Sequence, residues 1–383
     1  MLKLALTGGG SGGHTVPAVT VYQGFAQYAT EKNQDFHCVY LGSRDGIERD
    51  VAVEANIPYH IISTGKLRRY FSLKNVTDIF RIFKGICDSF WILRRVKPDI
   101  VFSTGGFVSV PVVIAARTLS IPVVIHEQTS SVGLANKIAA KFARKVCVSF
   151  PSSEKYFPRE KVILTGLPVR KVLRSGMAET CFEKYSLDRN LPLLYVTGGS
   201  QGSHLINTMI RDNLTELLEI CNVIHQCGKS PNHNDFEELL AVRESLTETI
   251  RHRYVVKDFV NEDELKDIYA GSSLLVGRSG AGTVNECLTL GIPAIFIPLA
   301  IATRNEQFHN AKILADIGAG IILEEDKLTA DRFIEEIKRL ILNPKKLQTM
   351  SDSLKDFSRG DSTEKIIEVI SHWAGWGHGV TTD

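Results

Sequence analysis

The sequence predicts two tandem α/β domains, each built around a doubly wound parallel sheet of the Rossmann type. Short Val/Ile-rich runs alternate with longer amphipathic stretches, which is typical of parallel strands covered on both faces. The pattern also restarts halfway along the chain, because LKLALTGGGSGGHTVPA (2–18) and LPLLYVTGGSQGSHLIN (191–207) share an apolar strand, Thr-Gly-Gly, a small-residue turn and a histidine. Both halves therefore follow the same order of strand, turn and helix.

The first domain is predicted to span residues 1–164 and the second residues 165–361, with a linker at Thr165–Arg170. A last helix at 362–376 is expected to pack back on the first domain. The first long helix is expected at Pro17–Ala29. The expected strands are 3–7, 37–41, 99–103 and 122–126 in the first domain, and 191–197, 222–226, 273–276 and 294–297 in the second.

Composition excludes several classes of protein. The 383 residues are 44% hydrophobic and 23% charged, so the chain is neither disordered nor a small disulfide scaffold. Residues 1–163 carry a net charge of +9 and the remainder −7, so the first half is expected to meet something anionic. The seven cysteines contain no C-x-x-C pair, which favours reduced thiols in a cytoplasmic protein. No run of about 18 apolar residues occurs, so we expect any membrane contact to be peripheral.

Two glycine-rich turns stand out as candidate ligand sites: the first glycine turn, TGGGSGGH (7–14), and the second glycine turn, TGGSQGS (197–203). Each leads into a helix, whose free N–H groups and partial positive charge suit a diphosphate. One such turn could be only a tight connection, but its repetition favours ligand binding. Neither turn is a P-loop or a dinucleotide fingerprint. The chain also has no D-x-D pair, which argues against a metal-held nucleotide, and we expect no metal and no cofactor.

Three polar side chains near these turns are candidates for chemistry. His14 opens the helix after the first glycine turn, where a helix N-terminus favours a neutral imidazole that can act as a general base. A capping or packing role is the alternative for His14. Glu286, in GRSGAGTVNE (277–286), could accept hydrogen bonds from a ribose diol, although most helix glutamates are merely solvated. Gln307 and Glu306 follow the next strand and are further candidates.

The segment Lys66–Lys97 combines nine basic residues with six aromatic residues and only two acidic ones. Its apolar residues fall at helical spacing, and core packing accounts for much of that stripe. The excess charge and the aromatic residues favour a surface that binds anionic lipid. No nucleic-acid-binding motif is present, so nucleic acid is not an expected partner. The predicted membrane patch comprises Phe71, Phe80, Phe83, Trp91, Arg68, Arg69 and Lys74.

Seven segments in order along nearly the whole chain carry a family resemblance: 7–18, 103–111, 124–137, 165–170, 197–207, 278–286 and 306–311. Together they resemble the MurG family, the UDP-N-acetylglucosamine:N-acetylmuramyl-(pentapeptide) pyrophosphoryl-undecaprenol N-acetylglucosaminyltransferases of peptidoglycan synthesis. The resemblance implies an inverting glycosyltransferase with the two-domain GT-B fold. It also implies UDP-GlcNAc as donor, mostly on the second domain, the lipid-linked muramyl-pentapeptide as acceptor, and a place on the cytoplasmic face of the cell membrane.

The resemblance also implies roles for particular residues. His14 is the expected base, with Glu127 as an alternative or helper, and the departing UDP is expected to be met by turn amides and Arg170. The donor and diphosphate contacts carried over are Ser11, Gly12, Gly13, Thr129, Arg170, Ser200, Gln201, Val260, Ala281, Gly282, Thr283, Val284, Asn285, Glu286 and Gln307.

This chain departs from the family at HEQT (126–129), where many relatives have HEQN, so Thr129 replaces an amide. Three alternatives stay open: a related transferase with a different lipid acceptor, a UDP-GlcNAc 2-epimerase, and a non-catalytic sugar-nucleotide-binding subunit. The sequence leaves the acceptor, the choice of base, the oligomeric state and the order of substrate binding undecided.

Overall fold

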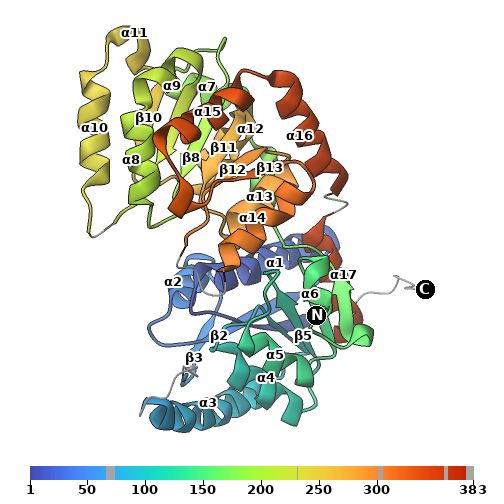
Figure 1. Ribbon diagram of the computed structural model, residues 1–383. Helices are drawn as coiled ribbons and strands as arrows, with labels where there is room; N and C mark the ends of the chain where they lie inside the picture. The colour runs from blue at the N-terminus through green and yellow to red at the C-terminus, as the bar shows by residue number, and fades with distance from the viewer. Residues whose placement is uncertain (66–73, 231, 301–304, 358–360, 377–383) are drawn as a thin grey trace. The chain divides into compact units, whose positions relative to one another are not determined.

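The computed structural model describes residues 1–65, 74–230, 232–300, 305–357 and 361–376, and the chain forms two compact units (Figure 1). Unit 1 consists of Met1–Val169 together with Asp361–Asp383, and unit 2 consists of Arg170–Gly360. The boundary between the two units, between Val169 and Arg170, lies within the predicted linker, and the last helix belongs to unit 1.

Unit 1 contains a seven-stranded, all-parallel sheet in the order β3-β2-β1-β4-β5-β6-β7. Its elements are β1 (Leu2–Thr7), α1 (Gly12–Glu31), β2 (Phe36–Gly42), α2 (Ile47–Glu54), β3 (Tyr59–Ile61), α3 (Lys74–Val96), β4 (Ile100–Ser103), α4 (Ser109–Thr118), β5 (Val123–Glu127), α5 (Leu134–Phe142), β6 (Lys145–Val148), α6 (Pro151–Glu154), β7 (Val162–Leu164) and α17 (Ser362–Ala374).

Unit 2 contains a six-stranded, all-parallel sheet in the order β10-β9-β8-β11-β12-β13. Its elements are α7 (Ala178–Tyr185), β8 (Leu193–Thr197), α8 (His204–Asp212), α9 (Leu214–Ile220), β9 (Asn222–Gln226), α10 (Asp235–Ser245), α11 (Glu248–Arg251), β10 (Tyr254–Lys257), α12 (Glu262–Gly271), β11 (Ser272–Gly277), α13 (Ala281–Leu290), β12 (Ala294–Phe296), α14 (Glu306–Asp316), β13 (Gly320–Ile322), α15 (Ala330–Ile341) and α16 (Pro344–Phe357).

The two sheets share one topology, and the predicted fold class is confirmed. In each unit the first strand lies third from one edge, and the chain reverses direction across the sheet between the first and fourth strands, β1 and β4 or β8 and β11. Doubly wound sheets bind ligands at this reversal, beyond the carboxyl ends of the strands. Each glycine turn follows the first strand of its unit, so both turns lie at such a reversal point.

The first long helix starts earlier than predicted. The sequence suggested Pro17 as its beginning, but α1 begins at Gly12 and contains Pro17 in its second turn. The end of the first glycine turn is therefore already helical, and His14 is the third residue of α1. The prediction missed this because glycine lowers helix propensity, whereas here the turn is fixed by its packing.

Apolar clusters cover both faces of the unit 1 sheet. One face packs against α1, α2 and α17, and the other against α3, α4 and α5. Helix α17 supplies Ile366, Ile367 and Ile370 to the first cluster. Gly24 of α1 lies close to this helix, because a Cβ atom there would be 2.8 Å from Ile367. The last helix is therefore an integral layer of unit 1.

A buried carboxylate fixes the first glycine turn. Glu48, at the start of α2, has no exposed surface and accepts hydrogen bonds from the Gly10 N–H at 3.1 Å, the Ser43 N–H at 3.1 Å and the Ser43 hydroxyl. A Cβ atom at Gly9 would lie 2.6 Å from Glu48 Oε2, so the glycine leaves room for the carboxylate. Glu48 thereby ties the loop after β2 to the turn after β1.

Replacing Glu48 by alanine should destabilise unit 1 by about 2–4 kcal/mol, because several buried donors lose their acceptor. Glu48→Gln should cost less, since one acceptor oxygen remains. The exposed Glu54 on the same helix is the matched control, and Glu54→Ala should stay within about 0.5 kcal/mol of wild type. Denaturant unfolding measures all three variants. Equal stability of Glu48→Ala and Glu54→Ala would contradict this role.

Candidate functional site

His14 is held in one orientation beside the first glycine turn. Its Nδ1 lies 2.9 Å from the Thr104 carbonyl oxygen and 3.1 Å from Gln128 Oε1. Both partners are acceptors, so Nδ1 carries the hydrogen and, in the neutral ring, Nε2 keeps its lone pair. The half-buried imidazole therefore has the tautomer that a general base at Nε2 requires.

Gln128 is a residue that the sequence reasoning missed. Its side chain is buried, and its Nε2 donates to the carbonyl oxygens of Thr104 at 2.7 Å and His126 at 3.2 Å. These two donations fix the amide so that its oxygen faces His14. The motif HEQT contained the signal, but only the fold shows that Gln128 rather than its neighbours reaches the histidine.

Two further polar residues of that motif, Glu127 and His126, bind other parts of the chain. Glu127 is buried, and its carboxylate accepts hydrogen bonds from the Thr129 N–H, the Thr129 hydroxyl, the Gly133 N–H and Asn136 Nδ2 at 2.9–3.3 Å. These contacts fix the loop between β5 and α5. His126 is fully buried, and burial lowers the pKa of its imidazole to about 4. Neither side chain is as well placed as His14 to take a proton.

The start of α1 offers exposed backbone. Ser11 and Gly13 are exposed, and no atom lies within 4 Å of a Cβ atom built at Gly12. The carbonyl oxygen of Ser11 accepts from the N–H groups of His14 and Thr15 and from the Thr15 hydroxyl. The open face of this helix N-terminus is suited to an anionic group.

Unit 2 presents a similar surface at its own reversal point. Ser200 and Gln201 are exposed on the second glycine turn. The Arg278 N–H donates to the Thr197 carbonyl oxygen at 3.2 Å, so the turn after β8 touches the loop after β11. The predicted residues of these two loops are thus brought to one place.

Glu286 is fixed by two other residues. Tyr269 donates its hydroxyl to Glu286 Oε2 at 2.6 Å, and Arg170 contacts Glu286 Oε1 at 3.3 Å. Burial, followed by the charge of Glu286, raises the pKa of the Tyr269 phenol well above its ordinary value, so the phenol stays a donor. Arg170 also contacts Glu262 at 3.5 Å, so its charge is shared between two carboxylates. The sequence reasoning missed Tyr269, since no motif contains it.

Two of the predicted contact residues on α13 point inward. Val284 has no exposed surface, and Asn285 is buried with its Nδ2 donating to the Ala281 carbonyl oxygen at 2.7 Å. Their side chains face the core, so a ligand contact at these two positions would have to come from the backbone. The helix period explains this outcome, because Ala281, Gly282, Thr283 and Glu286 remain accessible while the intervening residues face the sheet. Val260 is also buried, which leaves its backbone as the only possible contact.

Gln307 lies in the first turn of α14, close to the loop after β11. Its Oε1 accepts from the Leu299 N–H at 3.0 Å, and its own carbonyl oxygen accepts from the Ser279 hydroxyl at 2.8 Å. Glu306, the first residue of α14, is half-buried. No acceptor among the described residues binds the Gln307 amide nitrogen.

The outer face of α3 is apolar and exposed. Phe80, Phe83 and Trp91 are 71%, 65% and 67% exposed, whereas Phe90 packs against the core. The predicted stripe therefore splits into a buried face and an exposed one. Phe71, Arg68 and Arg69 lie outside the described residues, and for Lys74 the description covers the backbone alone. None of the described helices is long and apolar enough to cross a membrane.

Two family models match the chain. The glycosyltransferase family 28 N-terminal domain matches residues 4–148, and the glycosyltransferase family 28 C-terminal domain matches residues 193–366. The curated relatives include a UDP-N-acetylglucosamine--N-acetylmuramyl-(pentapeptide) pyrophosphoryl-undecaprenol N-acetylglucosamine transferase of Clostridium novyi, which is 40% identical over 97% of this chain and 98% of the relative. A protein of the same name from Clostridium perfringens is 39% identical over 96% of this chain and 97% of its own.

Solved structures agree with these matches. The crystal structure of Acinetobacter baumannii MurG superposes with a TM-score of 0.75 at 27% identity, covering 97% of this chain and all of that one. The UDP-GlcNAc 2-epimerase of Neisseria meningitidis gives a TM-score of 0.66 at 15% identity, covering 97% of this chain and all of that one, and shares the fold alone. With both halves matched and relatives aligned along nearly the whole chain, this protein belongs to glycosyltransferase family 28.

Proposed function

We propose that this protein transfers N-acetylglucosamine from UDP-GlcNAc to the lipid-linked N-acetylmuramyl-pentapeptide of peptidoglycan synthesis, with inversion at the anomeric carbon. The observation that carries the proposal is the full-length match to relatives that are named for this reaction, at up to 40% identity. The orientation of His14 supports it, because transfer to a hydroxyl needs a base. The epimerases share only the fold and give no reason to prefer their reaction.

In this mechanism His14 acts on the acceptor. Its Nε2 takes the proton of the acceptor hydroxyl as the hydroxyl oxygen bonds to the anomeric carbon of GlcNAc. The bond from that carbon to the diphosphate oxygen breaks in the same displacement, and UDP leaves with the electron pair. Gln128 and the Thr104 carbonyl keep the ring in the required tautomer, and the imidazolium that forms keeps both acceptors at Nδ1.

Unit 2 supplies the donor site in this proposal. The Glu286 carboxylate accepts hydrogen bonds from the ribose diol, because Tyr269 and Arg170 hold it in position on the second turn of α13. Ser200, Gln201 and the N-termini of α8 and α13 meet the diphosphate through hydroxyl and N–H groups. The Gln307 amide nitrogen is available to the sugar hydroxyls.

We also place the protein at the surface of an anionic membrane, through the exposed face of α3. Ile79, Phe80, Phe83 and Trp91 are all exposed on this helix, and Arg81 lies among them. Aromatic side chains insert into the interface while cations attract anionic headgroups. This face would bring the active site to an acceptor that stays in the bilayer.

The transfer and the role of His14 are tested together with labelled UDP-GlcNAc and a lipid-linked muramyl-pentapeptide acceptor. Wild type should form the labelled disaccharide product. His14→Ala should lower kcat by about 10²–10⁴-fold, the usual range for general base catalysis, and should leave UDP affinity unchanged. His37, exposed on β2, is the matched control, and His37→Ala should keep full activity. Near-wild-type kcat for His14→Ala would remove His14 from the mechanism, and absence of product with wild type would refute the proposed function.

The donor site is tested by calorimetry with UDP. Glu286→Ala should weaken UDP binding by roughly 10–100-fold, because a charged acceptor of hydrogen bonds is lost. Tyr269→Phe should weaken it less, since the carboxylate remains but is no longer fixed. Tyr185→Phe is the matched control, because that hydroxyl bonds Glu264 instead. Binding should survive EDTA. Unchanged affinity in Glu286→Ala would move the ribose elsewhere, and loss of binding in EDTA would contradict a metal-free donor site.

Vesicle binding tests the membrane face. Binding to anionic vesicles should weaken with salt but persist, because salt screens charges and not apolar insertion. Phe80→Ser with Phe83→Ser should remove the persistent part without lowering the melting temperature, since both rings are exposed. The control is Leu342→Ser, a change at an exposed apolar residue of unit 2. Equal binding by all three proteins, or a lower melting temperature of the double variant, would show that α3 has only a structural role.

A further inference from the structure

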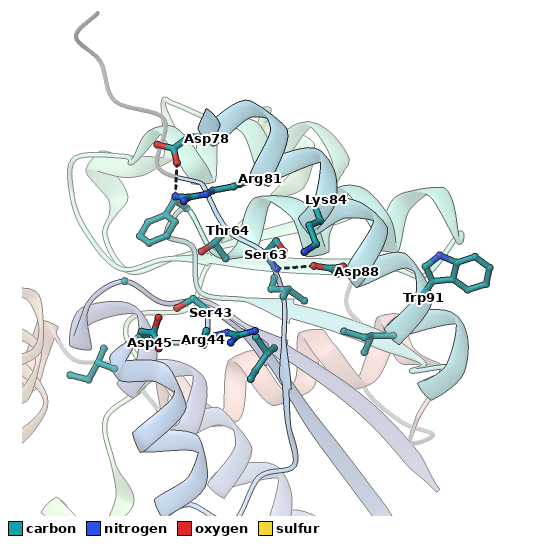
Figure 2. A pocket seen from close by; sticks show the side chains of 17 residues that line it. Ser43, Arg44, Asp45, Ser63, Thr64, Asp78, Arg81, Lys84, Asp88 and Trp91 are labelled. Atoms are coloured by element: carbon teal, nitrogen blue, oxygen red, sulfur yellow. Dashed lines mark hydrogen bonds and ion pairs between the residues drawn. The ribbon is translucent and has the colours of Figure 1, made fainter. Parts of the chain in front are cut away.

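A large cavity of unit 1 lies beside the first glycine turn, and we call it the α3 pocket. Its volume is about 1150 Å³, and its walls come from Ser43–Ile47 after β2, Ile61–Thr64 at the end of β3, one side of α3, Gly10 and Phe107. Figure 2 shows Arg44 on the loop after β2 and Lys84 on α3, on opposite sides of the space. Arg81 and Trp91 of this lining also belong to the exposed face of α3, whereas the loop after β2 and the end of β3 have no binding role assigned above.

Charges of both signs line the α3 pocket. Arg81 pairs with Asp78 at 3.5 Å, and Asp88 accepts a hydrogen bond from the Ser63 N–H at 3.0 Å. Two further cations, Arg44 and Lys84, are exposed, and no carboxylate pairs with either side chain in the described part of the chain. The pocket therefore offers two cations, Arg44 and Lys84, that no carboxylate of the described residues pairs with.

This lining selects among the parts of the proposed acceptor. An apolar chain would have to desolvate the charged walls of this pocket. A peptide with free carboxylates fits better, because carboxylates pair with the cations and its amides bond the polar backbone. An apolar pocket of about 180 Å³ between α3, α4 and α5 is a more suitable place for the start of a hydrocarbon chain, and Phe107 borders both cavities.

The α3 pocket is also joined to the turn that leads to His14. Gly10 lines the pocket, and the Glu48 carboxylate binds both Gly10 and Ser43 of the pocket wall. A sugar whose hydroxyl lies at His14 would therefore carry its peptide substituent toward a wall that is fixed relative to the turn. The distance between base and pocket is set by packing inside one unit.

Resting on the proposed function, we propose that the α3 pocket binds the peptide stem of the acceptor, with Arg44 and Lys84 pairing with its carboxylates. The peptide contributes to acceptor recognition, and its loss weakens recognition without affecting the chemistry at the sugar. Specificity for a peptide-bearing acceptor is thus located in unit 1.

The test compares two soluble acceptors with short prenyl chains, one carrying the muramyl-pentapeptide and the other the muramyl sugar without peptide. Wild type should use the pentapeptide acceptor with a higher kcat/KM. Arg44→Gln with Lys84→Gln should lower kcat/KM for that acceptor by about 10-fold or more, mainly through KM, and leave the peptide-free acceptor unchanged. The double variant should fold, since both side chains are exposed.

Arg94→Gln with Arg95→Gln provides the matched control, because it removes the same charge from exposed positions of α3 outside the pocket. Equal loss with both acceptors, no loss, or an equal effect of the control would overturn the proposal. Titration of the free pentapeptide supplies a second readout, with binding expected for wild type and not for the double variant. If wild type transfers sugar to neither acceptor, the proposed function fails, whereas transfer without peptide discrimination refutes the pocket alone.

Discussion

The site geometry depends on the contact of backbone with backbone where neighbouring turns meet at the carboxyl edge of each sheet. In unit 1 the Gly9 N–H donates to the Gly105 carbonyl oxygen at 3.2 Å, and a Cβ atom at Gly106 would collide with the Gly9 carbonyl oxygen. In unit 2 a Cβ atom at Gly202 would collide with the backbone at Cys227. Only glycine allows such contact. It draws strand ends together and sets where the following helices begin.

The orientation of His14 in unit 1 depends on this contact. The turn after β4 lies against the first glycine turn, so the Thr104 carbonyl oxygen reaches His14 while the Thr104 hydroxyl donates to the His14 carbonyl oxygen at 2.6 Å. The side chains of successive residues in an extended chain point to opposite sides, so the side chains of Glu127 and Gln128 face different neighbours. Glu127 accepts a hydrogen bond from the loop before α5, whereas Gln128 accepts one from the His14 imidazole and so helps to fix its orientation. The tautomer is therefore a property of three chain segments rather than of His14 alone.

Unit 2 fixes a carboxylate in the same way that unit 1 fixes an imidazole. Glu286 is set by a phenol from α12 and a guanidinium that precedes α7. A group held in place before it meets its partner loses little freedom on binding, which is why such support strengthens a site. The two units share a topology, and in both of them neighbouring residues orient one polar side chain, although the two groups differ in kind.

The sequence by itself determined the fold class, the approximate positions of most strands and the two glycine turns, because Val/Ile runs and repeated glycine turns are local patterns. It also singled out His14 and Glu286, whose motifs are contiguous. Only the tertiary structure decided which side chains support them, since Gln128 and Tyr269 reach their partners across 114 and 17 residues. It likewise turned the Val284 side chain of α13 toward the core, and it divided the apolar stripe of α3 into a buried face and an exposed face. Local pattern fixes which residues form an element, but the face that an element turns to its neighbours follows from packing between distant segments, which no single window of sequence contains.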